Sequence, residues 1–373
     1  MARLDKIQDN FANGDFETAT SDKDIKSQSN LDLLLNGIAL FHQDEFAQSD
    51  SVFEEFNKRN LHETSSSLSR EAAGLLLGQN VNSYKPYMMD SLFVSYYQIW
   101  DLLAMHEWSN ARVVINQSYA RQQNMSKEYK KLIEENKNKI SEKTEYQQVV
   151  DKNISDWAAF SDIMNPALMY LSGIYFLNDG DFDNATTYLK RANGMMPENT
   201  FIAQDLKLAQ NHKRPQNITW QFIDTGFAPR LREKNGGIFL PYLGMVYFSF
   251  TEPYSNSSPV PPKDSELLAN VDAMFMTEYR EYQTNEILRS FASAASKTAL
   301  QASLYNSHSS SAPLLGILSS VYTVSSSNSD VRTWATLPKY IYISRTNNET
   351  GNKLIYTRII NDNIQDNKTI TLK

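Results

Sequence analysis

Cysteine is absent from the 373 residues of this chain. Its absence excludes disulfides, thiolate metal sites and a cysteine nucleophile. The chain also lacks any run of about 18 uncharged apolar residues, the length that a membrane-spanning helix needs. Its five histidines include no pair at the i, i+4 spacing of a helical zinc site. We therefore predict that the protein has no metal, no cofactor and no transmembrane segment.

Glycine-rich catalytic loops are missing as well. Only 13 glycines occur, and the pair Gly236-Gly237 is not followed by the Lys-Ser/Thr of a phosphate-binding loop. No serine lies in a Gly-x-Ser-x-Gly turn. The acidic pairs Glu54-Glu55 and Glu134-Glu135 are adjacent on helical patterns, so their side chains point about 100° apart and do not form a dyad. The sequence therefore predicts a protein that is not an enzyme.

An excess of basic residues is also absent. The chain has 36 basic and 43 acidic residues and a net charge of -7. Phosphate binding depends on concentrated Lys and Arg, so we do not expect a nucleic-acid partner. In contrast, 41% apolar residues and 12% aromatic residues are ample for buried cores, and the length allows two domains.

One stretch, residues 166–197, has the spacing of a tetratricopeptide helical hairpin. Gly173 removes a side chain where two helices cross, Gly180 supplies the turn, and Pro197 ends the second helix because it has no amide donor. Such hairpins stack into arrays that bind partners. The residues that carry the spacing are Gly173, Phe176, Gly180, Phe182, Ala185, Leu189, Ala192 and Pro197.

Weaker copies of the hairpin lie upstream. Aligned on the aromatic residue that follows the turn, the copies are separated by intervals of 30, 62 and 74 residues, which indicates inserted helices, one of them over residues 69–80. The second copy has Gly37 at the crossing position, whereas the third has Ile99. The aligned aromatic residues are Phe16, Phe46, Trp108 and Phe182, and the residues three positions later are Ala19, Ser49, Ala111 and Ala185.

Residues 125–160 follow the third copy and carry apolar positions at helical spacing among many Lys and Glu. We expect a long helix that is mostly solvated. A coiled-coil contact is the alternative, but Asn136 and Lys143 interrupt the apolar stripe.

After Pro215 the pattern changes from helical to period two, so we predict domains at residues 1–214 and 215–373. Strands are expected at residues 218–223, 237–240 and 245–250, with a loop at 255–263 and a strand or helix start at 271–276. A helix begins at Thr284 and packs on a sheet through the apolar face Ile287, Leu288, Phe291, Ala294, Ala295, Thr298 and Ala302. Ser-rich runs at 307–311 and 325–329 bracket an apolar segment at 314–324. The last strands, at 339–344, 353–360 and 368–372, are predicted to form a meander.

The fold class that follows is α + α/β: an irregular tetratricopeptide-like helical array, then a smaller mixed α/β domain with C-terminal antiparallel strands. Within that domain, Arg289 and Lys297 lie eight residues apart on one helix side and could hold an anionic group, although a solvated face is the plainer interpretation. For Arg332 and Trp334 we expect a structural clamp, with the guanidinium stacked on the indole. Arg280 and Glu281 are further polar candidates.

Several landmarks of the C-terminal region occur in a set order. They are Gly-Phe-Ala-Pro at 226–229, Leu-Pro at 240–241, Glu-Pro-Tyr at 252–254, a helix at 289–297 and Asp-x-Arg-x-Trp-x-x-Leu-Pro at 330–338. With them, the chain resembles, over nearly its whole length, an uncharacterised family of bacterial tetratricopeptide-containing lipoproteins. Members often occur beside penicillin-binding-protein activator lipoproteins.

The resemblance implies a periplasmic protein, anchored in the outer membrane as a lipoprotein in its native form. This chain has no leader and no lipidated cysteine, so we expect that an anchor stood upstream of Arg3. A cytoplasmic protein is the alternative.

These patterns predict a non-catalytic scaffold or adaptor of the cell envelope. We expect it to bind a protein partner, an envelope lipoprotein or a component of cell-wall synthesis, through the concave face of the array. Tyr96, Tyr97 and Tyr170 are the candidate groove residues. In one alternative, the C-terminal domain binds or processes a small anionic ligand or cell-wall glycan. In another, the protein is a self-assembling structural subunit with an uncovered strand edge.

Overall fold

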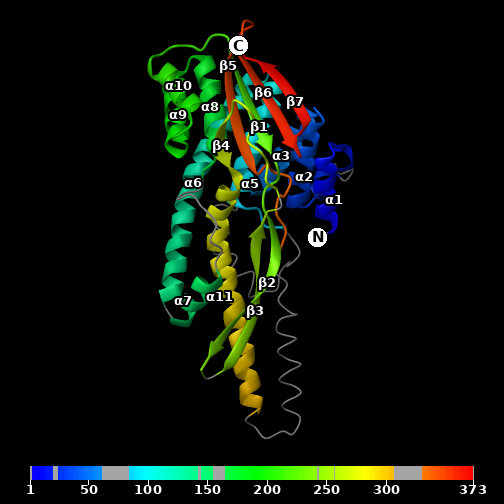
Figure 1. The fold of residues 1–373 in the computed structure, drawn as a ribbon, viewed down its shortest axis with the longest axis vertical. Helices are drawn as coiled ribbons and strands as arrows, with labels where there is room; N and C mark the ends of the chain where they lie inside the picture. The colour runs from blue at the N-terminus through cyan, green and yellow to red at the C-terminus, as the bar shows by residue number, and fades with distance from the viewer. Residues whose placement is uncertain are drawn as a thin grey trace.

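The computed structural model describes residues 2–19, 24–60, 84–141, 144–153, 164–241, 243–255, 257–305 and 330–372. Helices fill the first part of the chain and a mixed sheet follows (Figure 1), so the protein is α+β as the sequence predicts. Expected elements at residues 69–80 and 314–324, and the Ser-rich runs, lie outside the described residues.

Three helical hairpins stand in a row within the described part of the chain. They pair α2 (Asn30–His42) with α3 (Phe46–Asn60), α5 (Met88–Ala104) with α6 (Trp108–Ser141), and α8 (Pro166–Asp179) with α9 (Phe182–Met195). The shorter helices around them are α1 (Ala2–Ala12), α7 (Thr144–Asn153), α10 (Thr200–Gln210) and the 3-10 turns Glu17–Ala19 and Ile25–Ser27.

The three hairpins share one turn geometry. Asp44, His106 and Gly180 occupy the same place and have φ values of 63°, 60° and 84°. The amide that follows each of them donates to the carbonyl five residues earlier in the chain, the helix-ending arrangement that a left-handed residue allows. The next helix then begins at Phe46, Trp108 or Phe182, which confirms the alignment for these copies. The first copy is wrong, because the described residues between Phe16 and α2 form two short 3-10 turns in place of a second helix.

Small residues let the paired helices approach closely. A Cβ atom on Gly37 would lie 2.5 Å from the Phe53 ring, and one on Gly173 would lie 2.7 Å from Leu189. Ala111, Ala185 and Ala192 are fully buried, as is Ser49. Helix α9 ends at Met195, two residues before Pro197. The two glycines and the small buried residues therefore lie at helix contacts, where their spacing placed them.

Helix α6 runs without a break from its hairpin into the segment predicted as a separate long helix. Asn136, expected to interrupt the apolar stripe, is buried, and its Nδ2 donates to the Glu281 carbonyl at 3.0 Å. Tyr129 likewise donates to the carbonyl of Thr277. The helix is thus fastened along one side by hydrogen bonds to backbone carbonyls of another helix, while most of its residues from 125 to 141 stay exposed or half-buried. Residues 154–160 of the predicted helix lie outside the described residues.

The main sheet has five strands in the order β4-β5-β1-β6-β7. Strand β1 pairs parallel to β6, and the other pairs are antiparallel. The predicted meander is therefore wrong in its order, because β1 lies between β5 and β6. The strands are β1 (Ile218–Thr225), β4 (Glu266–Asn270), β5 (Tyr340–Asn347), β6 (Lys353–Ile360) and β7 (Asn363–Thr371).

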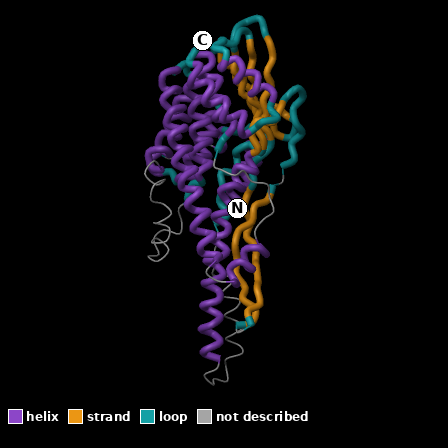
Figure 2. The backbone as a smooth tube through the Cα atoms, turned by 90° about the vertical axis from the view of Figure 1, so that its left-hand side faces the viewer, coloured by secondary structure: helices purple, strands orange, loops and turns teal. Residues whose placement is uncertain are grey.

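A two-stranded ribbon and a long helix extend away from this body, and we call them the arm (Figures 1 and 2). The ribbon is β2 (Arg230–Leu240) with β3 (Gly244–Tyr254), and the helix is α11 (Val271–Tyr305). The helix does not begin at Thr284: Asn270 Oδ1 accepts from the Ala273 amide at 3.0 Å and so caps a helix starting at Val271. Residues 271–276, for which the sequence left a strand or a helix start open, are therefore the first turns of this helix.

The apolar face predicted for this helix does pack on strands. Ile287, Phe291 and Ala294 form one buried cluster with side chains of the ribbon. The ribbon side chains are Ile238, Val246, Phe248 and Phe250, and Val149 of α7 joins them.

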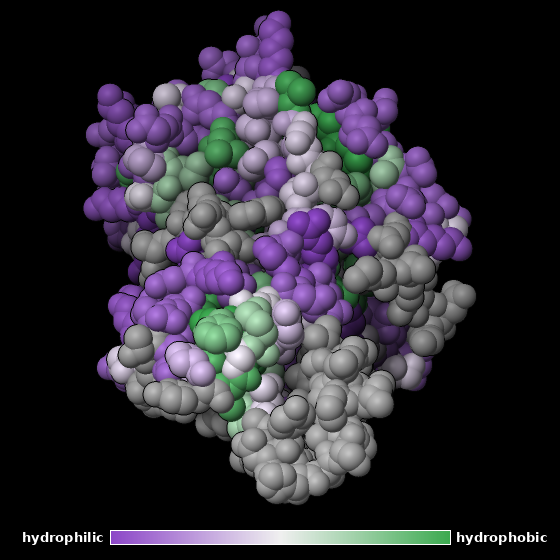
Figure 3. Space-filling model, turned by 60° about the horizontal axis from the view of Figure 1, so that its bottom comes forward, coloured by the Kyte–Doolittle hydropathy of each residue, from purple (hydrophilic) through white to green (hydrophobic). Residues whose placement is uncertain are grey.

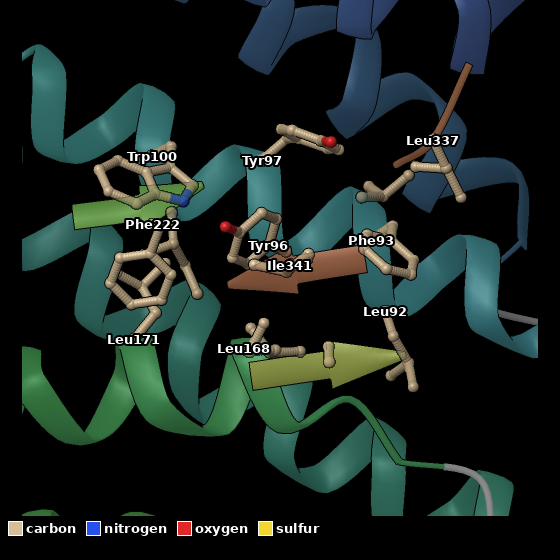
Figure 4. Close-up of a cluster of buried hydrophobic side chains, with 14 of the residues drawn as sticks. Leu92, Phe93, Tyr96, Tyr97, Trp100, Leu168, Leu171, Phe222, Leu337 and Ile341 are labelled. Atoms are coloured by element: carbon tan, nitrogen blue, oxygen red, sulfur yellow. The ribbon is translucent and has the colours of Figure 1, made fainter. Parts of the chain in front are cut away.

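The five-stranded sheet covers the first helices of the hairpins, so helices and strands form two layers (Figure 2). Trp100 of α5 lies 5.4 Å from Phe222 of β1 and 5.6 Å from Tyr356 of β6, between ring centroids. Leu168 and Leu171 of α8 point into the same cluster (Figure 4). A single apolar core therefore crosses the boundary at residue 215, where the chain changes from helix to strand.

Candidate interaction surfaces

The tyrosines expected to line an open groove are fully buried. Tyr96, Tyr97 and Tyr170 have no exposed surface, because the sheet lies on the helix faces that carry them. Buried side chains cannot contact a partner, so this placement corrects the prediction. The protein's own strands occupy the face of the first helices that an array would offer to a peptide.

Two of these tyrosines instead bind buried aspartates of the interface. Tyr170 donates to Asp205 at 2.6 Å, and the same carboxylate accepts from Trp220 at 2.7 Å and from Arg345 at 2.9 Å. Four groups from α8, α10, β1 and β5 therefore meet at one point. Burial raises the pKa of Asp205, while the Arg345 cation and these hydrogen bonds lower it.

The second aspartate, Asp224 of β1, pairs with a buried arginine that the sequence did not single out. Its Oδ2 accepts from Tyr97 at 3.2 Å and from Tyr356 at 2.9 Å, and it lies 4.0 Å from Arg358 Nη1. Burial raises the pKa of Asp224 to about 6 against the opposing effect of the Arg358 cation. Arg358 Nη2 also donates to the carbonyls of Gly226 and Thr336. The signal in the sequence was a charge placed among apolar residues near the end of β6.

Arg332 and Trp334 have different partners. The Arg332 guanidinium holds Asp330 with two hydrogen bonds of 2.7 Å. The Trp334 ring is buried, with its centroid 6.1 Å from Phe53 and 6.2 Å from Tyr97. Trp334 therefore joins the segment before β5 to helices α3 and α5. Trp334 is thus held by aromatic packing, whereas the predicted clamp was a guanidinium stacked on the indole.

Arg289 and Lys297 both lie on α11, where Arg289 is exposed and Lys297 is half-buried. Eight residues of helix separate them by about 12 Å along the axis. Arg332 lies outside this helix, beside Asp330. The geometry does not bring Arg289 and Lys297 together around one small anion. Of the polar candidates beside them, Glu281 accepts from Asn136 at 2.6 Å, so it fastens α11 to α6.

An exposed apolar surface that the sequence analysis missed lies on the ribbon. Phe239, Met245 and Tyr247 are 63%, 45% and 47% exposed. Single exposed apolar side chains are common, but a group of large ones on one face is informative. The strand register places Phe239 opposite Met245, and Gly237 opposite Tyr247. The signal was present in the alternation: residues 238, 246 and 248 face α11, so 239, 245 and 247 must face away. We call these three residues the tip patch.

The ribbon is held firmly against its helix near the body. The Thr251 amide donates to Glu286 at 3.0 Å, and Gln283 donates to the Thr251 carbonyl at 2.9 Å. Thr251 also bonds to the Tyr279 hydroxyl. Farther out, Lys152 of α7 donates to the Gly237 carbonyl at 3.0 Å. The tip patch therefore sits on a braced ribbon.

A buried carboxylate joins the arm to the helical array. Glu278 of α11 accepts from the amides of Met88 and Met89 at 2.6 and 3.0 Å, at the N-terminus of α5. Burial raises its pKa to about 8, although these amide hydrogen bonds oppose the rise. Asp90 in the same turn accepts from Tyr84, and burial raises its pKa to about 7.

Within the described residues, no helix combines the length and apolarity needed to cross a membrane. Those residues also contain no group of three His, Asp or Glu side chains placed to hold a metal ion. His62 and His308 fall outside them. Comparison of the chain with protein-family models, curated proteins and solved structures finds no match.

Proposed function

We propose that the protein is a non-catalytic scaffold of the cell envelope that binds a protein partner through the outer surface of its helical array. The observation that carries this proposal is the placement of the sheet on the first helices, α2, α5 and α8. The sheet braces the array from inside. The second helices, α3, α6 and α9, are then the helical-repeat surface left for a partner.

Val113 on α6 marks a place on that surface where a partner would bind. It is 51% exposed, and its neighbour Arg112 forms ion pairs with Asp179 at 3.0 Å and Asp181 at 2.5 Å. These pairs tie the second hairpin to the third. A partner that covers Val113 would therefore meet two hairpins held in one arrangement, which lowers the entropy cost of binding.

The compartment is part of the same proposal. The resemblance carried by residues 226–229 and 330–338 supports a periplasmic protein that is anchored in the outer membrane as a lipoprotein in its native form. Its partner would then be another envelope lipoprotein or a component of cell-wall synthesis. Fractionation of cells that express the native gene tests this, and recovery in the cytoplasm alone would contradict it.

A crosslinking experiment tests the partner surface. A photoreactive amino acid at position 113 should capture a defined protein from envelope extract, and a Val113→Glu variant should lose it. The same photoreactive group at Ile364, which is also exposed but lies on β7, is the matched control. Equal capture from both positions, or no capture by folded bait, would count against the proposal.

A further inference from the structure

We propose that the free end of the arm docks on the surface of an anionic lipid membrane, with the tip patch entering the interfacial region. This inference does not depend on the protein partner proposed for the helical array. It follows from the position of the patch, from its side chains and from the charge around it.

The first step is position. The arm extends from the body as its longest projection, and the ribbon turn lies toward its far end (Figures 1 and 2). The tip patch lies on the strand residues that flank this turn, because Phe239 and Met245 pair next to the last register pair, Leu240 with Gly244. The view of this end of the molecule shows apolar side chains gathered at the surface (Figure 3). The patch is therefore set apart from the body along the arm.

The second step is the side chains. An exposed ribbon face usually alternates polar residues outward, but this one presents Phe239, Met245 and Tyr247. Aromatic rings and flexible aliphatic chains at the end of a projection suit the boundary between headgroups and acyl chains. The inner face is already filled by α11, so the ribbon is apolar on both faces near its end. Water is a poor solvent for such an element.

The third step is charge. Residues 235–250 of the ribbon contain no charged residue. In residues 287–305 of α11, the charged residues are Arg289 and Lys297. The chain as a whole carries -7. Helix α7, which packs on the ribbon through Val149, adds Lys152 and the exposed carboxylates Glu145 and Asp151. Three cations and two carboxylates leave this end weakly cationic, whereas the rest of the chain is acidic, so an anionic surface would favour an approach with the end of the arm first.

Lys297 is well placed for such a contact. Ala294 and Ala295, less than one turn earlier on α11, belong to the same apolar cluster as Leu240 and Leu243 at the ribbon end. Lys297 therefore lies within one turn of the part of α11 that packs on the ribbon. A lipid headgroup at that level would meet a cation while Phe239 enters the apolar layer.

Flotation of the full chain with lipid vesicles tests the inference. Vesicles of phosphatidylcholine with phosphatidylglycerol should carry the protein upward, and vesicles of phosphatidylcholine alone should carry less. The double variant Phe239→Ser, Tyr247→Ser should lower partitioning at least tenfold, because two exposed apolar side chains lose their transfer from water. Lys297→Gln should weaken binding about fivefold on the anionic vesicles only.

Two controls show whether the lipid itself covers the tip patch. Ile364→Ser removes a comparably exposed apolar side chain on β7 and should leave flotation unchanged. In Phe239→Trp, the added indole should show a blue-shifted emission on vesicles and quenching by brominated lipid. Absence of flotation with every vesicle, or flotation that the double variant does not change, would overturn the inference. So would a dimer in light scattering that Phe239→Ser dissociates, since a second copy would then cover the patch.

Discussion

Two regions of the protein treat polar and apolar side chains in opposite ways. One is the junction between the helical array and the sheet, and the other is the free end of the arm. The junction buries charges, Asp205 with Arg345 and Asp224 with Arg358, and surrounds them with aromatic rings. The end of the arm carries almost no charge and leaves apolar side chains exposed. The first arrangement makes one pairing of helices and strands specific. The second leaves a surface that only a partner or a membrane can cover.

The largest expected effect is at the junction. Asp224→Ala should lower the free energy of unfolding by about 3–5 kcal/mol, because it leaves the buried Arg358 cation without its counter-charge. Chemical denaturation measures the loss. Asp224→Asn, which keeps an acceptor for Tyr97 and Tyr356, should lose less. If both variants matched the wild type, the buried pair would not be what fixes this interface.

The next effect concerns helix packing within the array. Gly173→Ala should destabilise the protein by about 1–3 kcal/mol, because the new Cβ would lie 2.7 Å from Leu189. Gly194→Ala in the neighbouring helix is the matched control, since no atom lies within 4 Å of its added Cβ. That variant should gain up to about 1 kcal/mol from helix propensity. Thermal unfolding of the two variants would separate the steric effect at the helix crossing from the effect of helix propensity. Equal shifts in Tm would refute the close approach of the helices at Gly173.

A third, pH-dependent effect tests the fastening of the arm to the array. The pKa of Glu278 in the folded protein, about 8, lies above its ordinary value of 4.5. Ionising this group is harder when folded, so its contribution to stability is greatest below pH 4.5 and declines as the pH rises to 8. Asp90 has the same sign, with a pKa of about 7.

Glu278→Gln should therefore flatten the stability profile between pH 5 and 8, as measured by denaturation at a series of pH values. His42 acts in the opposite direction, because burial lowers its pKa to about 4 and stability falls as the pH drops from 6.5. An unchanged slope in Glu278→Gln between pH 5 and 8 would show that the carboxyl is not buried as described.

The smallest effect on stability is expected at the tip patch. Phe239→Ser should change the free energy of unfolding by no more than about 0.5 kcal/mol, since the ring is already exposed. Phe291→Ala, on the α11 side of the same ribbon, is the contrasting variant and should loosen the arm. Hydrogen exchange of the ribbon amides distinguishes the two. Strong loss of protection in Phe239→Ser would mean that the patch supports the fold.

Local signals explain what sequence analysis predicted well. The hairpin turns follow from residues a few positions apart, such as Gly180 with Phe182, and the ribbon-facing side of α11 follows from the spacing of Ile287 and Phe291. The strand segments followed from period-two patterns. The misplaced start of α11 shows the limit, because the Asn270 cap lies before a segment that also suited a strand.

Long-range pairing explains what the sequence could not predict. Tyr97 and Tyr170 have the side chains of a binding groove, and only the sheet that covers them makes them core residues. Nothing in the sequence distinguishes Arg358 from the other basic residues. Only the pairing of β6 with β1 brings it near Asp224. The exposed patch needed both the ribbon register and the knowledge of which ribbon face meets α11.

The sequence by itself determined the helical hairpins, the change to strands near residue 215 and the uncharged stretch of the ribbon at 235–250, because each depends on neighbours along the chain or on composition. Only the tertiary structure decided that the strands fill the array, that β1 lies between β5 and β6, and that the tip patch stays exposed. Those outcomes depend on contacts between segments far apart in the chain, such as Tyr97 with Asp224, 127 residues apart, and Phe248 with Phe291. Local patterns do not contain them.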